Sequence, residues 1–486
     1  MTAKILINAV DPEECRIAKV IDNRLDEFHL ETSARATTKS NIYKAIVARV
    51  EPSLQAAFVD YGEERHGFLQ KQDIHSDYFQ HGDRNAPIQN LIKPGQELLV
   101  QVTRDPLMNK GAALTTFLSI PGRYCVLMPG SETIGVSKQI SDDEERKRLK
   151  EILGKVAIPD NIGIIMRTAA REATKTVVAN DIRYLLRLWK NIKDKGISSP
   201  APAPLHKERN LAVRVIRDYL TPDITEILID DPAIYQEVKD FVHVISPKHA
   251  KIVKPYSGAK PIFTKHQLEE QIESIFNAAV KLPSGGSIVL NQTEALVAID
   301  VNSGKSKQSA SVEETALQTN LEAAEEISRQ LRLRDMAGLI VIDFIDMKTR
   351  AHNSAVEKCL KTNLKNDKAR TRVGSISRFG LLEMSRQRLR QSLETASFVT
   401  CDHCGGKGYV LAADKLGVRF LRKLQLEANK NSGTHITARV PAEVADFLLN
   451  RKRSDILELE NRHGLTITIK GDAAMPRDES QIIWQT

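Results

Sequence analysis

Two short apolar runs that each end in an aspartate organise the middle of this chain: Ala295-Leu-Val-Ala-Ile-Asp300-Val-Asn302 and Leu339-Ile-Val-Ile-Asp343. Residues 294–301 and 338–345 are therefore predicted to be strands, and residues 311–334 between them have the pattern of a long helix. A strand, a helix and a second strand predict a right-handed crossover with two parallel, neighbouring strands. Their carboxyl ends, and with them the two aspartates, should lie together.

The two carboxylates need compensation if they meet at this edge. Alternation along the strand puts Asn302 on the same face as Asp300. Two ionised groups at the ends of buried strands repel each other and lose solvation, at a cost of several kcal/mol. Mg²⁺ is a usual compensation, because it is held by one or two carboxylates and takes further oxygens from phosphate. The alternative is that both aspartates cap strands or helices, with Asp343 hydrogen-bonded to loop amides. Asp346 should point away from Asp343 if the strand continues that far.

Length and composition indicate a soluble protein of about two to four domains. The 486 residues are 41% hydrophobic and 27% charged, and no apolar run approaches the roughly 20 residues that cross a bilayer. The first ten residues lack the features of a secretory signal, and five scattered cysteines do not suggest a disulfide framework, so we expect a cytoplasmic protein. The net charge of +8 favours a polyanionic partner.

The first half of the chain is predicted to contain a small barrel followed by an α/β region. Turn signals at Glu51-Pro52, Tyr61-Gly62 and Pro94-Gly95 separate five short strands, as in an oligonucleotide-binding (OB) barrel. Beyond the barrel, residues 162–167 are predicted to be a strand, followed by an amphipathic helix toward Lys195, and the proline-rich residues 198–204 to be a linker. The barrel strands are expected at 41–50, 54–61, 67–69, 97–103 and 112–120, later strands at 210–218, 226–230 and 287–291, and a helix at 265–280.

A pair of cysteines near the C-terminus has the spacing of a metal-binding knuckle. In Cys401-Asp-His-Cys404-Gly-Gly-Lys-Gly408 the glycines allow backbone amides to approach the sulfurs. Tetrahedral Zn²⁺ requires four ligands, so two chains could each contribute half of a site. A redox CxxC pair and a third ligand in His403 are the alternatives.

Four longer runs resemble the ribonuclease E/G family: Val297-Ala-Ile-Asp300-Val-Asn302, Arg329-Gln-Leu-Arg-Leu-Arg-Asp335, Ile340-Val-Ile-Asp343-Phe-Ile-Asp346-Met and Ser377-Arg-Phe-Gly-Leu-Leu-Glu-Met-Ser-Arg386. The resemblance implies that Asp300 and Asp343 bind Mg²⁺ and that Asn302 orients Asp300 or the scissile phosphate. It also implies a deoxyribonuclease-I-like catalytic domain. Hydrolysis by an activated water would leave a 5′-phosphate and a 3′-hydroxyl.

The same resemblance extends to the grip on RNA. Ala56-Ala-Phe58-Val-Asp-Tyr-Gly62, His66-Gly-Phe68-Leu and Asn109-Lys110-Gly look like the family's RNA-binding barrel, in which Phe58, Phe68 and Lys110 would contact RNA. From the residues alone, a core position is the favoured interpretation for both phenylalanines.

Two further runs, Gly122-Arg-Tyr-Cys-Val126 and Ile165-Met-Arg167-Thr168, look like its sensor for a 5′-monophosphate, with amides near Gly122 and Val126 completing a nest around the phosphate. The alternative is a surface arginine at a strand exit. Ala170-Arg171-Glu172 departs from the glycines expected after the sensor arginine.

The expected architecture is a multidomain α/β (α+β) protein with an OB-fold RNA-binding barrel inserted in an RNase H-like domain. The resemblance implies cleavage of single-stranded, A/U-rich RNA such as rRNA precursors and mRNA, and a homodimer or homotetramer joined by zinc between the Cys401 and Cys404 pairs. The chain has no Arg- and Pro-rich tail, which favours the ribonuclease G type or the catalytic half of ribonuclease E, without a stable degradosome scaffold. A non-catalytic RNA-binding regulator and a metal-dependent deoxyribonuclease are the rival functions. The predicted domains are 1–35 with 211–276 (RNase H-like), 36–120 (OB barrel), 121–210 (5′-sensor region), 277–398 (DNase I-like, catalytic), 399–412 (zinc link) and 413–486 (small C-terminal domain).

A basic stretch follows the catalytic strands. Most of its arginines are expected to be solvated surface charges, and some to track the RNA backbone. The residues are Arg370, Arg372, Arg378, Arg386, Arg388 and Arg390.

Overall fold

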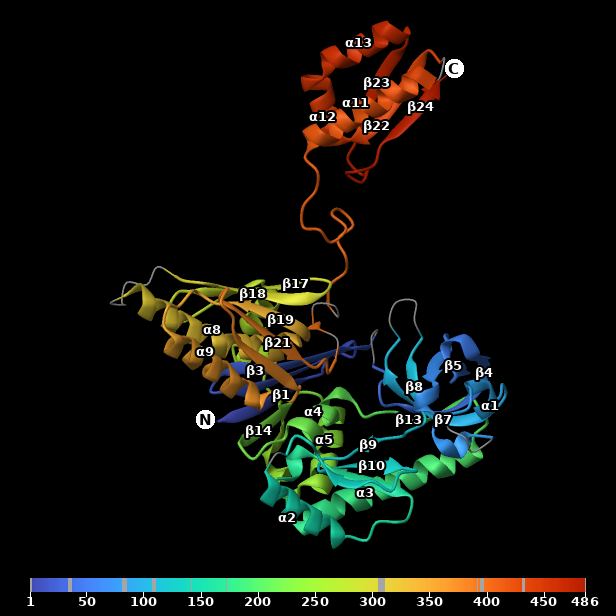
Figure 1. The fold of residues 1–486 in the computed structure, drawn as a ribbon, viewed down its shortest axis with the longest axis vertical. Helices are drawn as coiled ribbons and strands as arrows, with labels where there is room; N and C mark the ends of the chain where they lie inside the picture. Colours follow the sequence, from blue (N-terminus) through green and yellow to red (C-terminus); the bar gives the residue numbers. More distant parts are fainter. Residues whose placement is uncertain are drawn as a thin grey trace. The chain divides into compact units, whose positions relative to one another are not determined.

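A computed structural model describes residues 2–33, 37–80, 85–106, 111–140, 142–171, 173–304, 311–390, 392–393, 397–430 and 433–485. The chain divides into two compact units, residues 1–393 and 394–486 (Figure 1). The predicted RNA contact Lys110 lies outside the described residues.

One sheet of the first unit joins the N-terminus to residues far along the chain. Its strand order is β15-β14-β1-β2-β3, with β1 parallel to β14 and antiparallel to β2. Residues near the N-terminus and residues 224–255 thus share one sheet. The strands are β1 (Ala3–Asn8), β2 (Glu14–Ile21), β3 (Arg24–Thr32), β14 (Ile224–Ile229) and β15 (Val253–Pro255), and the helices α4 (Leu211–Tyr219) and α5 (Pro232–Ile245) pack on it.

The prediction of a strand over residues 210–218 was wrong, because this segment is helix α4. The Asn210 side chain caps the helix by accepting a hydrogen bond from the Val213 amide at 2.9 Å. Leu211, Val215 and Ile216 are buried at helical spacing. The β-branched residues suggested a strand, but burial at the i, i+4 spacing against the sheet decided the conformation.

The predicted barrel is present as a closed sheet. The strands follow the order β4-β5-β6-β8-β7, and β7 pairs again with β4, which closes the barrel. Tyr43, Val59, Leu69 and Val100 belong to its buried core. The barrel strands are β4 (Ile42–Glu51), β5 (Ala56–Asp60), β6 (Gly67–Gln70), β7 (Glu97–Arg104) and β8 (Ala113–Thr115), with the short helix α1 (Ile88–Leu91) beside them.

The proline-rich segment is not simply a linker. Its end forms strand β13 (Ala203–His206), which pairs antiparallel with the edge of β4. A proline is tolerated here because an edge strand leaves one side of its backbone unpaired.

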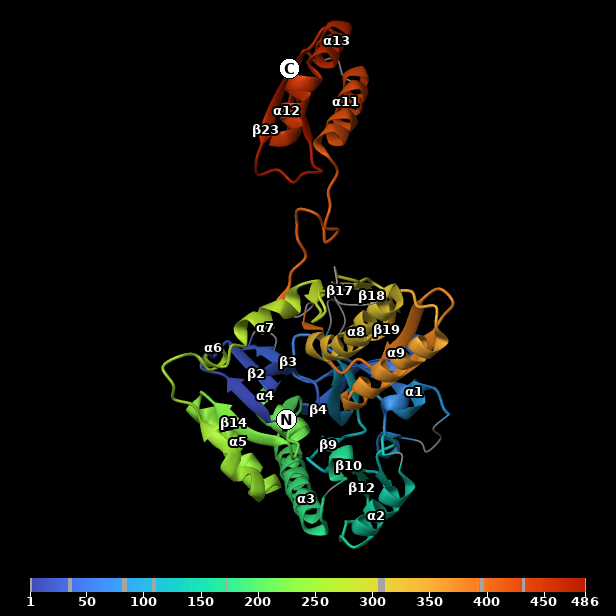
Figure 2. The ribbon, with the colours of Figure 1, turned by 90° about the vertical axis from the view of Figure 1, so that its left-hand side faces the viewer.

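A second α/β region follows the barrel, and its sheet lies beside helix α3 (Figure 2). The sheet order is β11-β12-β10-β9, and Leu127, Ile164, Ile182 and Leu185 form part of the core between sheet and helix. The elements are β9 (Ile120–Pro121), β10 (Cys125–Pro129), β11 (Ile134–Val136), α2 (Asp143–Gly154), β12 (Ile162–Met166) and α3 (Lys175–Ser198).

The sheet that carries the aspartates has the order β16-β17-β18-β19-β21-β20. Helices α8 and α9 lie side by side along it (Figure 1), and buried residues such as Ile299, Ile327, Ile340 and Leu360 join helices and sheet in one core. Alternate residues on the other face of the sheet are exposed or half-buried. The elements are β16 (Ala279–Lys281), β17 (Ser287–Gln292), β18 (Leu296–Asn302), α8 (Val312–Arg334), β19 (Gly338–Asp343), α9 (Arg350–Asn363), β20 (Thr371–Ile376) and β21 (Leu381–Arg386).

The helix predicted over residues 265–280 was only partly correct. The segment contains the end of α6 (Ile262–Lys265), the short helix α7 (Glu269–Glu273), a 3₁₀ turn and strand β16. Gln267 adopts a left-handed backbone conformation with φ 54°, which interrupts the helix.

The second unit is a small α/β domain. Its sheet has the order β23-β22-β24, with Ile436, Ala438, Leu424 and Leu448 in the core. No helix in the described part of the whole chain is long and apolar enough to cross a membrane. The elements are α11 (Ala413–Lys430), β22 (His435–Pro441), α12 (Ala442–Arg451), α13 (Arg453–His463), β23 (Thr466–Asp472) and β24 (Gln481–Gln485).

Candidate functional site

Asp300 and Asp343 are direct neighbours in the sheet. Strands β18 and β19 are parallel, and the last pair in their register is Asp300 with Asp343. Register partners in a parallel pair point to the same face, and neighbouring strands lie about 5 Å apart. Both side chains are exposed, whereas Ile299 and Ile342, one residue earlier in each strand, are buried. The two carboxylates therefore share the open face of the sheet at its carboxyl edge.

The donor set at this edge fits a magnesium ion. The Asn302 amide donates to Asp300 Oδ2 at 2.8 Å, which fixes the orientation of that carboxylate. Within the described ranges no loop amide donates to Asp343, so the capping alternative finds no support there. No cluster of three or more His, Cys, Asp and Glu with metal-binding geometry occurs among those residues. Two exposed carboxylates suit Mg²⁺, which keeps most of its waters, better than a cation that needs a complete protein cage.

Helix α8 holds the loop that follows Asp343, a feature that we did not predict. The buried Asn320 side chain donates to the Ile345 carbonyl at 2.8 Å and accepts from the Ile345 amide at 3.0 Å. Glu313 accepts from the amides of Lys348 and Thr349. The Lys348 amide foremost, then the His352 side chain and the Thr349 amide, lower the pKa of Glu313 to about 2. Strand β19 ends at Asp343, so the alternation expected for Asp346 does not apply.

The two predicted aromatic contacts lie together on the barrel. Phe58 and Phe68 are register partners on β5 and β6, with ring centroids 5.8 Å apart in an edge-to-face arrangement. Both side chains are half-buried, and the Arg49 guanidinium lies 4.8 Å from the Phe58 centroid. The rings and the arginine form a compact surface that suits stacking of a nucleobase.

The residues of the predicted phosphate sensor also converge. Arg167 follows β12 and donates to the Gly122 carbonyl at 2.7 Å, and Val126 pairs with Ile165 between β10 and β12. Thr168 begins the next 3₁₀ turn.

An acidic partner of Arg167 was not foreseen. Its guanidinium forms an ion pair with Asp218 at 2.7 Å. Burial opposes ionisation of Asp218, but the charges of Arg217 and Arg167 outweigh it and hold the pKa of that carboxyl well below its usual range. A phosphate reaching Arg167 would meet a site that already holds a carboxylate.

The amide nest expected near Gly122 is largely occupied. The N–H groups of Arg123, Tyr124 and Cys125 all donate to the buried Asp181 carboxylate, at 2.8–3.2 Å. A Cβ at Gly122 would lie 2.6 Å from Asp181 Oδ2, so glycine is required for this approach. Because the carboxylate comes from helix α3, the local sequence around Gly122 did not reveal it.

The cysteine knuckle has the predicted local geometry. The Gly408 amide donates to Cys404 Sγ at 3.3 Å, and Gly405, Gly406 and Gly408 all have positive φ. The amide of Gly408, followed by those of Gly406 and Lys407, lowers the pKa of Cys404 and favours the thiolate that a metal binds.

Comparison with known proteins decides the family. The profile of the Ribonuclease E/G family matches residues 119–389, more than half of the chain, and a profile described as RNase E/G, Thioredoxin-like domain matches residues 400–484. The chain belongs to the ribonuclease E/G family.

Curated members of the ribonuclease E/G family cover nearly all of this chain. Ribonuclease E of Haemophilus influenzae is 46% identical over 476 residues, which are 97% of this chain and 51% of that protein. Ribonuclease E of Escherichia coli K12 is 46% identical over 94% of this chain and 44% of its own length. The chain thus spans about half the length of these relatives. Ribonuclease G of Escherichia coli K12 is 33% identical over 99% of this chain and 100% of its own length.

Most arginines of the basic stretch are exposed, as expected, but Arg386 is buried. Arg386 is 4% exposed, and its guanidinium is bound to Asp367 at 2.6 and 3.1 Å. Arg390 is likewise engaged, since it forms an ion pair with the buried Asp335. Arg370, Arg372, Arg378 and Arg388 are exposed as predicted.

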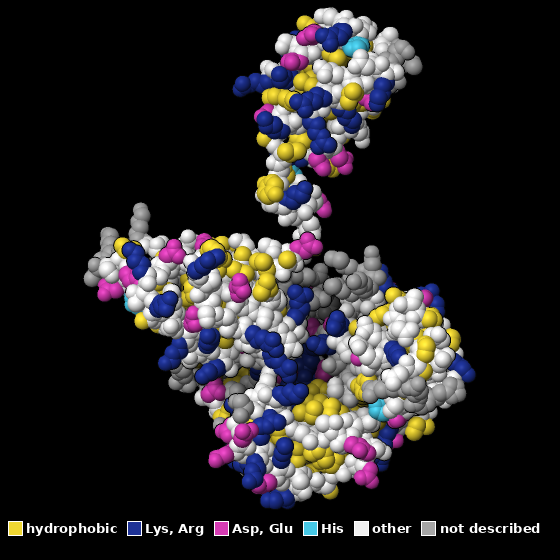
Figure 3. All heavy atoms as spheres, viewed as in Figure 1, with side chains coloured by type: hydrophobic (Ala, Val, Ile, Leu, Met, Phe, Trp, Pro, Cys, Tyr) yellow, Lys and Arg dark blue, Asp and Glu magenta, His cyan; other side chains and the backbone are white. Residues whose placement is uncertain are grey.

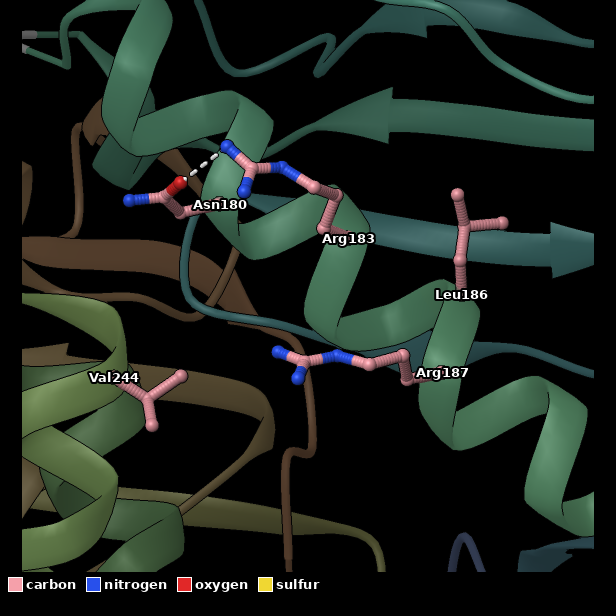
Figure 4. Close-up of a pocket in the computed structure, with 5 residues that line it drawn as sticks. All are labelled: Asn180, Arg183, Leu186, Arg187 and Val244. Atoms are coloured by element: carbon pink, nitrogen blue, oxygen red, sulfur yellow. Dashed lines mark hydrogen bonds between the residues drawn. The ribbon is translucent and has the colours of Figure 1, made fainter.

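Basic side chains also gather at two other places on the surface of this chain. Figure 3 shows Lys and Arg side chains gathered around a hollow of the first unit. A separate groove of about 490 Å³ lies between α3 and α5 and is lined by Asn180, Arg183, Leu186, Arg187 and Val244. In Figure 4 Arg183 is bound to Asn180, at 2.7 Å, and the Arg187 side chain extends toward Val244. This groove contains none of the predicted site residues.

Proposed function

We propose that this chain is a metal-dependent endoribonuclease whose reaction centre is the Asp300–Asp343 pair. The observation that carries the proposal is the register of β18 and β19, which places two exposed carboxylates side by side at one sheet edge. Membership of the ribonuclease E/G family supports RNA as the substrate. The net charge of +8 and the basic hollow are consistent with a phosphate backbone as ligand.

The proposed cofactor is Mg²⁺, held by Asp300 and Asp343. When bound, such an ion supplies charge neutralisation for a phosphodiester and for the oxygen that leaves it. Asn302 keeps the Asp300 carboxylate in one orientation, and the hydrogen bonds from Asn320 to Ile345 hold the backbone just beyond Asp343. Attack of water on phosphorus, with the 3′ oxygen leaving, gives a 5′-phosphate and a 3′-hydroxyl.

The proposed substrate is single-stranded, A/U-rich RNA, including rRNA precursors and mRNA in the cytoplasm. Stacking of bases on Phe58 and Phe68 favours an unpaired strand, because paired bases are not free to stack on a protein ring. Lys110 completes this contact in the proposal.

Preference for a 5′-monophosphate is proposed to depend on Arg167, with Gly122, Val126 and Thr168 around it. The Asp218 ion pair gives this proposal a specific form, since the phosphate must compete with a carboxylate for the guanidinium or share it.

Zinc binding is proposed at Cys401 and Cys404. Two thiolates are half of a tetrahedral site, so the ion would be shared with the same pair of a second copy, giving a homodimer or a dimer of dimers. The sheet β15-β14-β1-β2-β3 is proposed to belong to an RNase H-like domain, and the sheet β16-β17-β18-β19-β21-β20 to a DNase I-like domain.

The reaction centre is tested with labelled single-stranded RNA and DNA of one sequence, each with Mg²⁺ or with chelator. Cleavage of RNA only, and only with Mg²⁺, is expected. Asp343→Asn should lose cleavage by about 10²-fold or more while keeping RNA affinity. Glu294→Gln is the matched control, because this exposed carboxylate precedes the opposite end of β18. RNA binding without cleavage by the wild type would instead support a non-catalytic RNA-binding regulator, and cleavage of DNA a deoxyribonuclease.

A further inference from the structure

An exposed phenylalanine stands at the same sheet edge as the two aspartates. Residues 377–380 form the turn between β20 and β21, and Leu381, the first residue of β21, is the register partner of Asp343. Phe379 is 69% exposed, more than any other phenylalanine in the described part of the chain. Its backbone lies two residues, or about 7 Å of extended chain, from the row that contains Asp343.

The turn that carries Phe379 is firmly held. The Ser377 amide donates to the Leu381 carbonyl at 2.8 Å, the Gly380 amide to the Ser377 carbonyl at 3.1 Å, and the Phe379 amide to Ser377 Oγ at 3.3 Å. Gly380 has φ 79°, and a Cβ there would lie 3.0 Å from Asp346 Oδ1. The turn therefore contacts the loop that follows Asp343, and the position of the ring is coupled to that of the aspartate.

Because it is exposed, this ring contributes little to the stability of the fold. Burying a phenylalanine side chain contributes roughly 1.5–3 kcal/mol, which the protein forgoes at this position. The neighbouring Arg378 guanidinium lies 4.8 Å from the ring centroid, where it adds a positive charge to one side of an apolar surface. An aromatic ring with an arginine, set rigidly beside a phosphodiester site, has the chemistry that binds a nucleobase and its phosphate.

We propose that Phe379 stacks on a base of the RNA strand within roughly one or two nucleotides of the phosphodiester held at Asp300 and Asp343. The proposal rests on the proposed endoribonuclease function and adds a specificity-determining residue to its site. Arg378 contributes attraction for the adjacent phosphate. Charge complementarity selects RNA over a second copy of this basic chain, because Arg370, Arg372 and Arg378 on and beside β20 are all exposed.

The test couples one side chain to one base. A series of single-stranded RNAs with one cleavage site is prepared. Each RNA carries an abasic nucleotide at a different position near that site. With wild-type enzyme, one abasic position is expected to lower kcat/KM by about 5- to 150-fold, the usual range for loss of a stacked base. Phe379→Ala should show a similar loss on intact RNA and no further loss with that abasic substrate. Phe379→Tyr, which keeps a ring, should restore the wild-type profile.

Controls separate this inference from the proposed function. Phe117, 38% exposed and before β9, offers Phe117→Ala as a matched aromatic deletion whose abasic profile should stay that of the wild type. If the wild type cleaves and Phe379→Ala cleaves every substrate of the series as fast as the wild type does, the stacking proposal is wrong and the endoribonuclease stands. If light scattering shows that Phe379→Ala changes the oligomeric state with an unchanged abasic profile, the ring belongs to an interface between copies. Absence of cleavage by the wild type overturns both.

Discussion

Replacing Arg386 by methionine should destabilise the first unit strongly, although the residue lies in a stretch with the composition of a basic surface. The guanidinium and the Asp367 carboxylate each have side chains only 2% exposed. Arg386 Nη1 also donates to the Met336 carbonyl at 2.8 Å and lies 3.7 Å from Asp335. Removing one member of a buried pair leaves an uncompensated charge and costs about 3–5 kcal/mol. The lost bond to Met336 adds about 1 kcal/mol.

The measurement uses the two tryptophans of the chain, Trp189 in the first unit and Trp484 in the second. In a Trp484→Phe background, fluorescence during urea unfolding reports the first unit alone. Arg386→Met should lower its free energy of unfolding by about 4–6 kcal/mol with an unchanged m-value. Hydrogen exchange of the β21 amides should accelerate in parallel.

Two further variants make the reasoning refutable. Arg388→Met removes an exposed arginine two residues away and should cost within about 0.5 kcal/mol. The double variant Arg386→Met with Asp367→Leu should recover most of the stability, because apolar residues of similar volume can replace a buried ion pair at little cost. A single Arg386→Met variant as stable as Arg388→Met would show that the pair is not desolvated as the structure indicates.

Other predictions concern acid stability, RNA binding, the loop that follows Asp343 and the Cys401–Cys404 knuckle. Burial and the Arg390 charge lower the pKa of His29 to about 4. As the pH falls from about 6.5 to about 4, the unfolded chain therefore binds more protons than the folded chain, and the free energy of unfolding decreases. The urea midpoint should drop over this range, and it should drop less in His29→Gln. Phe58→Ala should weaken single-stranded RNA binding by about 1–3 kcal/mol in fluorescence anisotropy, and equal affinity would exclude stacking there. Asn320→Ala should leave the Ile345 backbone groups unpaired and cost about 1–3 kcal/mol of stability. It should slow cleavage more than it weakens RNA binding. An unchanged kcat would contradict a positioning role for Asn320. Cys401→Ser should remove zinc and reduce the assembly in native mass spectrometry, and an intact zinc-bearing oligomer would argue against the shared site.

The juxtaposition of Asp300 and Asp343 at one sheet edge could be predicted from the sequence because it follows from local periodicity. Apolar runs ending at Asp300 and Asp343, with a long helix between them, allow few topologies, and parallel pairing then brings the carboxyl ends together. The same reasoning located the barrel strands, the Phe58–Phe68 pair and the glycines around Cys404. In each case the deciding interactions lie within one element or between neighbouring strands.

The partners of buried charges were not predictable in this way. Asp181 accepts hydrogen bonds from the amides beside Gly122. Asp218 forms an ion pair with Arg167, and Asp367 forms a buried one with Arg386. Each of these carboxylates comes from a different segment of the chain than the group that it binds. The sequence alone determined which elements form and where two aspartates end their strands. Only the tertiary structure decided which charged groups are free for a ligand, because desolvation and pairing depend on what the rest of the chain packs against them.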